Sequence, residues 1–128
     1  MGGVRYQVLS HRDESGPSLE RIRSRFGSKL CCHAREAPFV GQDAPVHIIF
    51  VEGDSSLEDI DVIHTPGHTD GSICYFHRSP TGKSYLFTGD TVVQWNGRWA
   101  TLVLRNAGGS VEGRIADDEA FRGERQPV

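Results

Sequence analysis

Two histidines and an aspartate stand next to segments that read as neighbouring strands. His64 and His68 occur in HTPGHTDGS, and Asp90 follows in LFTGDT. Imidazole nitrogens and carboxylate oxygens are ligands that zinc, iron and manganese accept in proteins. A lone His/Asp pair is more often two ordinary turn residues, because Asp is common in turns and histidines are often exposed. Residue types alone therefore identify candidates for a divalent metal site without assigning one.

The segments around these residues predict a strand, a loop and a hairpin. Apolar and acidic residues alternate from Leu57 to Ile63, which is the period of a half-buried strand. A loop marked by Pro and Gly follows, and then Ser72 to Phe76 and Ser84 to Thr88 read as two strands joined by a turn. Because that turn reverses the chain once, we expect His68 and Asp90 to share one edge of the sheet.

The N-terminal part of the chain reads as a strand, a loop, a helix and a second strand. Val4 to Ser10 alternates and delivers His11 to the loop. Pro17 suits the first position of a helix that Gly27 ends, and Lys29 to His33 forms the next strand. Such units pair their strands in parallel and place ligand sites at the carboxyl end of the first strand. We therefore expect His11 at the edge that carries the later motifs.

Two further segments complete the predicted strands. Val46 to Val51 reads as one strand. Asn96-Gly97 is the strongest short turn signal, and it predicts a hairpin that pairs Thr91 to Trp95 with Arg98 to Leu104. We expect the two tryptophans of this hairpin to cap a core.

The two later motifs resemble signatures of the metallo-β-lactamase superfamily, which includes glyoxalase II-like thioesterases. HTPGHTDGS and LFTGDT match its second and third signatures at the spacing that the family uses, and two signatures in register are more specific than either alone. The resemblance, over about Tyr6 to Arg105, implies an α/β fold: a partial αββα sandwich with a mixed sheet and a flanking helix. It implies that His68 is a metal ligand and that Asp90 bridges metals, whereas His64 is usually not a ligand.

The first motif departs from the family, which has HxHxDH at this place. SHRDESGPS keeps the first histidine as His11, but Asp13, Ser15 and Gly16 stand where His, Asp and His are expected. Asp13 is either a substitute oxygen ligand or an exposed turn acid ahead of the helix. The sequence also lacks the late metal-binding histidine of the family. The resemblance therefore implies an incomplete and degenerate member.

The predicted ligand set is His11, His68 and Asp90, and Asp90 is also the catalytic candidate that orients metal and water. In the family, a divalent metal activates water for attack on a carbonyl or phosphoryl centre. We expect a hydrolase of the ester or thioester type with a small-molecule substrate. It would hold zinc, or iron or manganese in its place, and its activity would be impaired by the missing ligands. The alternative is a non-catalytic or truncated relative with one metal or none, which acts by binding if at all.

Composition excludes several other classes of protein. A formal charge of −3 without a basic run argues against nucleic acid or a membrane surface as partner, and the apolar stretches are strand-sized. Three cysteines without CxxC spacing predict a reducing compartment, such as the cytoplasm. We expect one incomplete domain over residues 1–106 and a polar, flexible tail over residues 107–128. Association into a homo-oligomer is one way in which such a domain could be completed.

Overall fold

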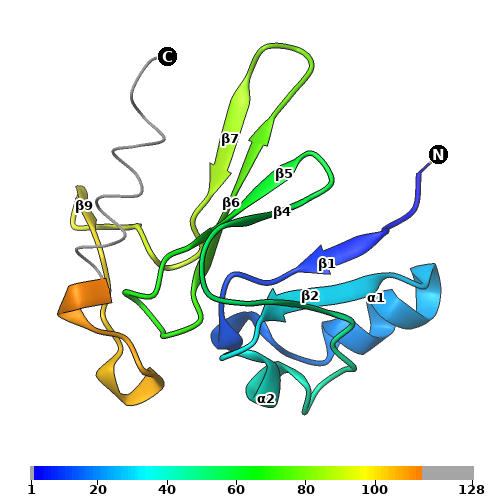
Figure 1. Cartoon of the computed structure of the whole chain (residues 1–128), viewed down its shortest axis with the longest axis horizontal. Helices are drawn as coiled ribbons and strands as arrows, with labels where there is room; N and C mark the ends of the chain where they lie inside the picture. The colour runs from blue at the N-terminus through cyan, green and yellow to red at the C-terminus, as the bar shows by residue number, and fades with distance from the viewer. Residues whose placement is uncertain (1, 114–128) are drawn as a thin grey trace. The chain divides into compact units, whose positions relative to one another are not determined.

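The structure is a computed structural model that describes residues 2–113. The chain divides into two compact units, Met1–Val51 and Glu52–Val128. The first unit is built of helices and parallel strands, and the second is built almost entirely of antiparallel strands (Figure 1). None of the helices in the described part of the chain is long and apolar enough to cross a membrane.

A parallel sheet with the order β1-β2-β3 forms the first unit. Its strands are β1 (Tyr6–Val8), β2 (Lys29–His33) and β3 (Ile48–Phe50). Between them lie the short turn η1 (Arg12–Glu14), helix α1 (Ser18–Phe26) and helix α2 (Ala37–Val40). The predicted strand, helix, strand unit with parallel pairing is thereby confirmed, with Val8 opposite Cys31 and Cys31 opposite Ile48.

Helix α1 ends where the sequence predicts. Gly27 adopts φ +66°, a left-handed conformation that favours glycine, and its N–H donates to the carbonyl of Arg23 at 2.8 Å. Leu19 turns from this helix into a core that also contains the following buried residues: Leu9, Leu30, Cys32, Val40 and Ala44. Both cysteines of β2 are buried, because β2 is the middle strand of the sheet and is covered on both faces. Alternation of side chains along a strand predicts only that one of two consecutive residues faces the core.

The second unit contains an antiparallel sheet with the order β4-β5-β6-β7. Its strands are β4 (Ser55–Leu57), β5 (Ile60–His64), β6 (Ile73–Arg78) and β7 (Ser84–Phe87). The prediction of one continuous strand from Leu57 to Ile63 was wrong, because the chain makes a tight turn in which Glu58 adopts φ +54° and Leu57 pairs with Ile60. The β6–β7 hairpin is as predicted (Figure 1).

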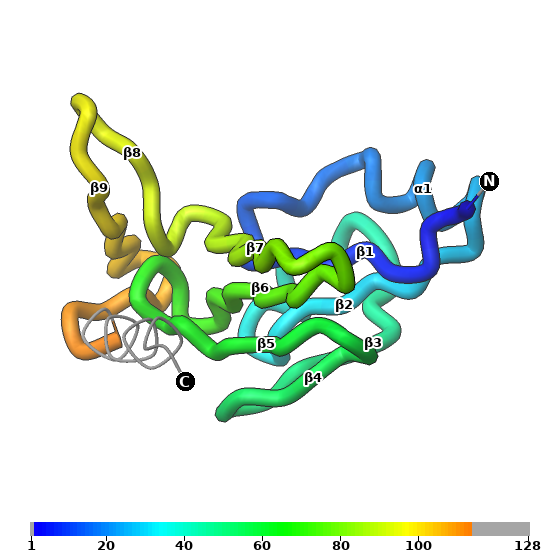
Figure 2. The backbone as a smooth tube through the Cα atoms, turned by 90° about the horizontal axis from the view of Figure 1, so that it is seen from above, coloured from blue at the N-terminus to red at the C-terminus, as the bar shows by residue number. Residues whose placement is uncertain are grey.

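The Asn96-Gly97 hairpin also forms, as β8 (Val93–Trp95) and β9 (Arg98–Ala100). Both turn residues have positive φ, 49° and 74°, as a two-residue hairpin turn requires. Figure 2 shows this hairpin projecting from the rest of the second unit. The prediction that Trp95 and Trp99 cap a core was wrong, since these residues are 66% and 76% exposed on the projecting strands.

Candidate metal centre

The loop that joins β5 to β6 is fixed by its own hydrogen bonds. Thr65 N–H donates to the Ser72 carbonyl at 2.8 Å, and Thr69 N–H donates to Ser72 Oγ at 2.9 Å. The Ser72 N–H returns to the Thr69 carbonyl at 3.3 Å. All three residues are buried, so the HTPGHTDGS motif folds into a compact loop that carries His68.

The His68 ring is oriented through its Nδ1 atom. Nδ1 lies 3.1 Å from the carbonyl oxygen of Leu102. Because a carbonyl oxygen only accepts, Nδ1 carries a proton, and in the neutral ring the lone pair is then on Nε2. Nε2 lies 3.7 Å from Oδ2 of Asp90. The predicted meeting of His68 and Asp90 at one edge is therefore confirmed, while their role as ligands stays a prediction.

Residues after the β8–β9 hairpin cover this loop. The Leu104 N–H donates to the His68 carbonyl at 2.9 Å, and the Asp70 N–H donates to the Ala107 carbonyl at 3.2 Å, beside the short turn η2 (Arg105–Ala107). A Cβ atom on Gly109 would lie only 2.6 Å from the Gly67 carbonyl oxygen, so this backbone approach requires glycine. β9 is shorter than the predicted strand because the chain leaves the hairpin to make these contacts. The boundary predicted at residue 106 stays a prediction, since residues 114–128 of the predicted tail lie outside the described part.

His64 braces the same loop from the end of β5. Its Nε2 donates to the Asp70 carbonyl at 3.1 Å, and its Nδ1 lies 3.3 Å from Glu52 Oε2. Its backbone N–H donates to Asp54 Oδ1 at 3.2 Å. These contacts give His64 a structural role, and the expectation that it is not a ligand stays a prediction.

His11 belongs to the first unit and sits directly before η1. The ring is buried, with Nδ1 2.8 Å from Ser10 Oγ and Nε2 3.9 Å from Asp13 Oδ2. Asp13 is 61% exposed, which allows either reading that the sequence leaves open. The Ser15 hydroxyl donates a hydrogen bond to Asp43 Oδ2 at 2.6 Å.

No protein-family model matches the chain. The probable hydroxyacylglutathione hydrolase of Schizosaccharomyces pombe is 38% identical over 82 residues, which are 64% of this chain and 30% of that protein. The di-iron-bound form of the protein TTHA1623 has a TM-score of 0.69 at 17% identity, covering 91% of this chain and 62% of that one. The FEZ-1 metallo-β-lactamase from Legionella gormanii has a TM-score of 0.61 at 15% identity, covering 93% of this chain and 54% of that one.

The chain has the fold of the metallo-β-lactamases, and its sequence is similar to part of a probable hydroxyacylglutathione hydrolase. The solved structures also confirm the predicted α/β fold class. The chain spans less than a third of the length of its curated relative and less than two thirds of each solved structure.

The nitrogen of His68 and the carboxylate of Asp90 are donors that fit a divalent metal. Two ligand atoms bonded to one tetrahedral zinc at about 2.0–2.1 Å are separated by roughly 3.3 Å, and the His68–Asp90 distance of 3.7 Å is close to that value. Among the described residues, neither unit alone brings three ligand atoms of His, Cys, Asp or Glu within 4.8 Å of one another. The placement of His11 beside His68 stays a prediction.

Three other titratable side chains in the described part of the chain have surroundings of their own. His77 lies on β6 near the opposite end of the sheet, and its Nδ1 is 3.6 Å from Asp59 Oδ2. Burial raises the pKa of Cys31 to about 11 and that of Cys32 to about 12, so both are protonated thiols at neutral pH. In the metal-free chain neither cysteine is therefore an activated nucleophile at neutral pH.

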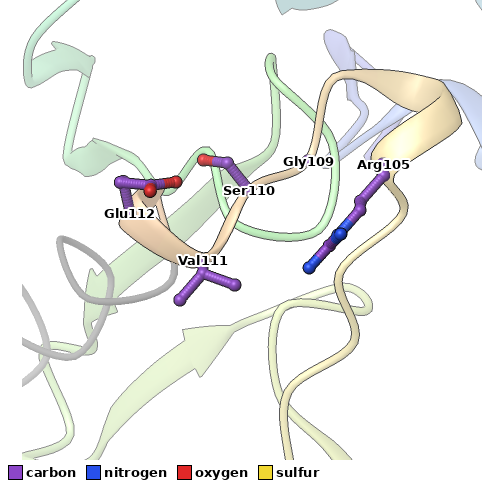
Figure 3. A pocket seen from close by; sticks show the side chains of 5 residues that line it. All are labelled: Arg105, Gly109, Ser110, Val111 and Glu112. Atoms are coloured by element: carbon purple, nitrogen blue, oxygen red, sulfur yellow. The ribbon is translucent and has the colours of Figure 1, made fainter.

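An open hollow of about 430 Å³ lies on the covering segment of the second unit. Figure 3 shows Arg105 and Glu112 on opposite sides of it. The remaining lining residues are Gly109, Ser110 and Val111. Its lining includes neither His68 nor Asp90.

Sequence reasoning missed the groups that orient the two histidines. The Leu102 carbonyl could not be found, because every residue carries the same carbonyl group. The role of Ser10 and Glu14 was only weakly indicated by the sequence. An acidic residue three positions after the N-cap often accepts a hydrogen bond from the N-cap backbone. His11 at that start position obscures the pattern, because histidine is not a preferred N-cap residue.

Proposed function

We propose that this chain is a metal-dependent hydrolase that holds one divalent metal through His68, Asp90 and His11 and cleaves an ester or thioester bond in a small molecule. The observation that carries the proposal is the His68 Nε2 atom 3.7 Å from Asp90 Oδ2. The Leu102 carbonyl fixes the proton on Nδ1, and this gives the lone pair to the nitrogen that faces the carboxylate. A metal ligand pair therefore requires no change of tautomer.

A divalent metal held by these residues would polarise the scissile carbonyl and activate water. Asp90 is the catalytic candidate among the ligands, since its carboxylate is 49% exposed and can accept a hydrogen bond from water. His68 is buried, so its part is to bind and to stay oriented. Zinc is proposed first, with iron and manganese as alternatives, because the donor set is one of nitrogen and oxygen.

The substrate class rests on the curated relative, whose name specifies an acylated thiol. We infer an ester or thioester of a small molecule for this chain. Three buried, free cysteines also support the reducing compartment that the sequence predicts.

Activity should be low because the first motif supplies few side chains that can bind a metal. Gly16 has no side chain, and the Ser15 hydroxyl donates a hydrogen bond to Asp43. Asp13 supplies an oxygen on the Nε2 side of His11, at 3.9 Å from that atom. Catalytic zinc usually takes three protein ligands and leaves a position for water, so we propose at most one weakly bound metal.

The small number of metal-binding side chains in the first motif also favours a second candidate function. If His11 and Asp13 do not complete the ligand set, the chain holds one metal or none, and it then acts by binding rather than by hydrolysis. A chain that binds no metal excludes the first candidate, whereas one metal per chain fits both candidates and turnover must then separate them.

The test is metal analysis of the purified chain, followed by zinc titration and assays against a panel of esters, thioesters and β-lactams. We expect no more than one zinc per chain and slow turnover, with both lost in His68→Ala and Asp90→Asn. Asp59→Asn is the matched control, because Asp59 faces His77 at 3.6 Å in a similar pair on the same sheet. This control should change neither zinc binding nor turnover.

Two results would overturn the proposal. Tight binding of two metals per chain would show that substitute ligands complete a full dinuclear site. Zinc binding and turnover that survive both His68→Ala and Asp90→Asn would place the site elsewhere.

A further inference from the structure

A hydroxyl group connects the His11 ring to a carboxylate. Ser10 Oγ lies 2.8 Å from His11 Nδ1 and 2.7 Å from Glu14 Oε1. Ser10 and His11 are buried, at 7% and 3% exposure. The three groups therefore form a short chain of hydrogen bonds at the edge of η1.

The number of protons on these three groups fixes the direction of each hydrogen bond between them. A carboxylate only accepts hydrogen bonds, so the single hydroxyl proton of Ser10 is directed to Glu14. Ser10 Oγ must then accept from the His11 ring, which places the ring proton on Nδ1. Nε2 is left as the nitrogen with the lone pair, and it is the atom 3.9 Å from Asp13 Oδ2.

The backbone on both sides of His11 is held as well. Glu14 Oε1 accepts from the backbone N–H groups of Ser10 and of His11, the latter at 3.3 Å. On the other side, the Arg12 N–H donates to Glu36 Oε1 at 2.9 Å, and the Glu36 side chain is fully buried. Ring orientation and backbone position are thus set by two carboxylates and one hydroxyl.

We propose that Ser10 and Glu14 are positioning residues that hold His11 as its Nδ1–H tautomer and so present Nε2 as a metal ligand. The metal part rests on the proposed function, whereas the tautomer is a property of the metal-free chain. Histidines that bind metals commonly donate their other ring N–H to an oxygen acceptor, and loss of that acceptor typically costs about 10- to 100-fold in metal affinity. Here the acceptor is a serine hydroxyl whose own proton is taken by a carboxylate.

The test measures the ring nitrogens of His11 by ¹⁵N NMR in the full, metal-free chain at pH 8.5, where an imidazole is neutral. We expect the Nδ1–H form in the unmodified chain, a shift toward Nε2–H in Ser10→Ala, and retention of Nδ1–H in Ser10→Thr. Zinc affinity should fall about 10- to 100-fold in Ser10→Ala and recover in Ser10→Thr. Ser15→Ala is the matched control, because Ser15 also donates to a carboxylate in this unit but not beside the ring.

An Nε2–H tautomer in the unmodified chain, or an unchanged tautomer in Ser10→Ala, would overturn the inference. Equal effects of Ser10→Ala and Ser15→Ala on the ring would also overturn it, since the change would then be a general loosening of the unit. A chain that binds no zinc but keeps His11 as Nδ1–H would support the tautomer assignment and overturn the proposed function instead.

Discussion

The loops that carry His11 and His68 hold their imidazoles in the same tautomer by different means. The Nδ1–H group of His68 is donated to a backbone carbonyl, that of Leu102, and main-chain hydrogen bonds fix the loop around it. The Nδ1–H group of His11 is donated to the Ser10 side chain, which Glu14 supports. In each case Nε2 faces an aspartate, at 3.7 Å in the second unit and 3.9 Å in the first.

This difference determines how each loop responds to substitution. The His68 loop is held mainly by backbone groups, with support from the Ser72 hydroxyl and the His64 ring, and the carbonyl that orients His68 does not depend on any one side chain. A scaffold of side chains can be dismantled one residue at a time. The His11 loop is of this kind, and it is also the loop whose sequence departs most from the superfamily.

The largest effect on stability is expected at the buried ion pair behind the His11 loop. Glu36 accepts from the Arg12 backbone at 2.9 Å and from its Nη2 at 2.6 Å, and Arg12 is itself largely buried. Removing the carboxylate in Glu36→Ala leaves a desolvated guanidinium without its partner. The free energy of unfolding should fall by about 3 kcal/mol, measured by urea denaturation.

Glu20→Ala is the control for this prediction. Glu20 pairs with Arg23 at the same distance of 2.6 Å, but both side chains are on the exposed face of α1. Exposed pairs contribute little, so the urea midpoint should hardly move. Similar losses in the two variants would show that burial is not what makes the Glu36 pair important.

The second prediction tests the main-chain scaffold of the His68 loop. A methyl group in Gly109→Ala would press against the carbonyl oxygens of Gly67 and His68, and neither can move without displacing the loop. We expect a loss of about 2 kcal/mol in the free energy of unfolding. Gly16→Ala, where nothing lies within 4 Å of the added carbon, should leave stability nearly unchanged. A fully stable Gly109→Ala variant would mean that the covering segment is not packed as described.

Much of the fold could be predicted because local signals agreed with the final pairing. Gly27 marked the end of α1, and Asn96-Gly97 marked the β8–β9 turn. The turn at Glu58 was missed because a glutamate with φ +54° gives no turn signal. The exposed tryptophans were missed because alternation shows that a face is apolar, not whether anything covers it.

The meeting of His68 and Asp90 was predictable, because it depends only on the reversal of the chain between them. One hairpin between His68 and Asp90 suffices to bring their loops to one edge, and the structure places Nε2 and Oδ2 3.7 Å apart. The partners of the two rings were not predictable, since the Leu102 carbonyl depends on where the chain goes after β9. Ligand function of His11, His68 and Asp90 stays a prediction.

A third prediction uses pH to compare the buried thiols of β2 with the unfolded chain. Burial raises the pKa of Cys31 to about 11 and of Cys32 to about 12, above the ordinary value of 9.0. Below pH 9 both states are protonated and the stability is intact. Between pH 9 and the raised values the unfolded chain loses protons that the folded chain keeps, so stability falls as pH rises, by about 1 kcal/mol per pH unit for each thiol.

Urea denaturation at pH 8 and pH 10.5 measures this fall. Cys32→Ala should reduce the fall, even though the variant is less stable at both values. Thiol reagents supply an independent check, because the buried cysteines should react at pH 8 only after unfolding. Rapid labelling of Cys31 and Cys32 in the folded chain would show that these side chains are accessible and the pKa values not raised.

The smallest effect is expected for Leu102→Ala, which completes the comparison between the loops. The Leu102 side chain is 41% exposed, and its link to His68 runs through the carbonyl oxygen that alanine also has. His68 should therefore remain the Nδ1–H tautomer in ¹⁵N NMR spectra, with a change in unfolding free energy below about 1 kcal/mol. Ser10→Ala should shift His11 in the same experiment. A shift of His68 to Nε2–H in Leu102→Ala would mean that packing of the leucine side chain, and not the backbone alone, holds the carbonyl in place.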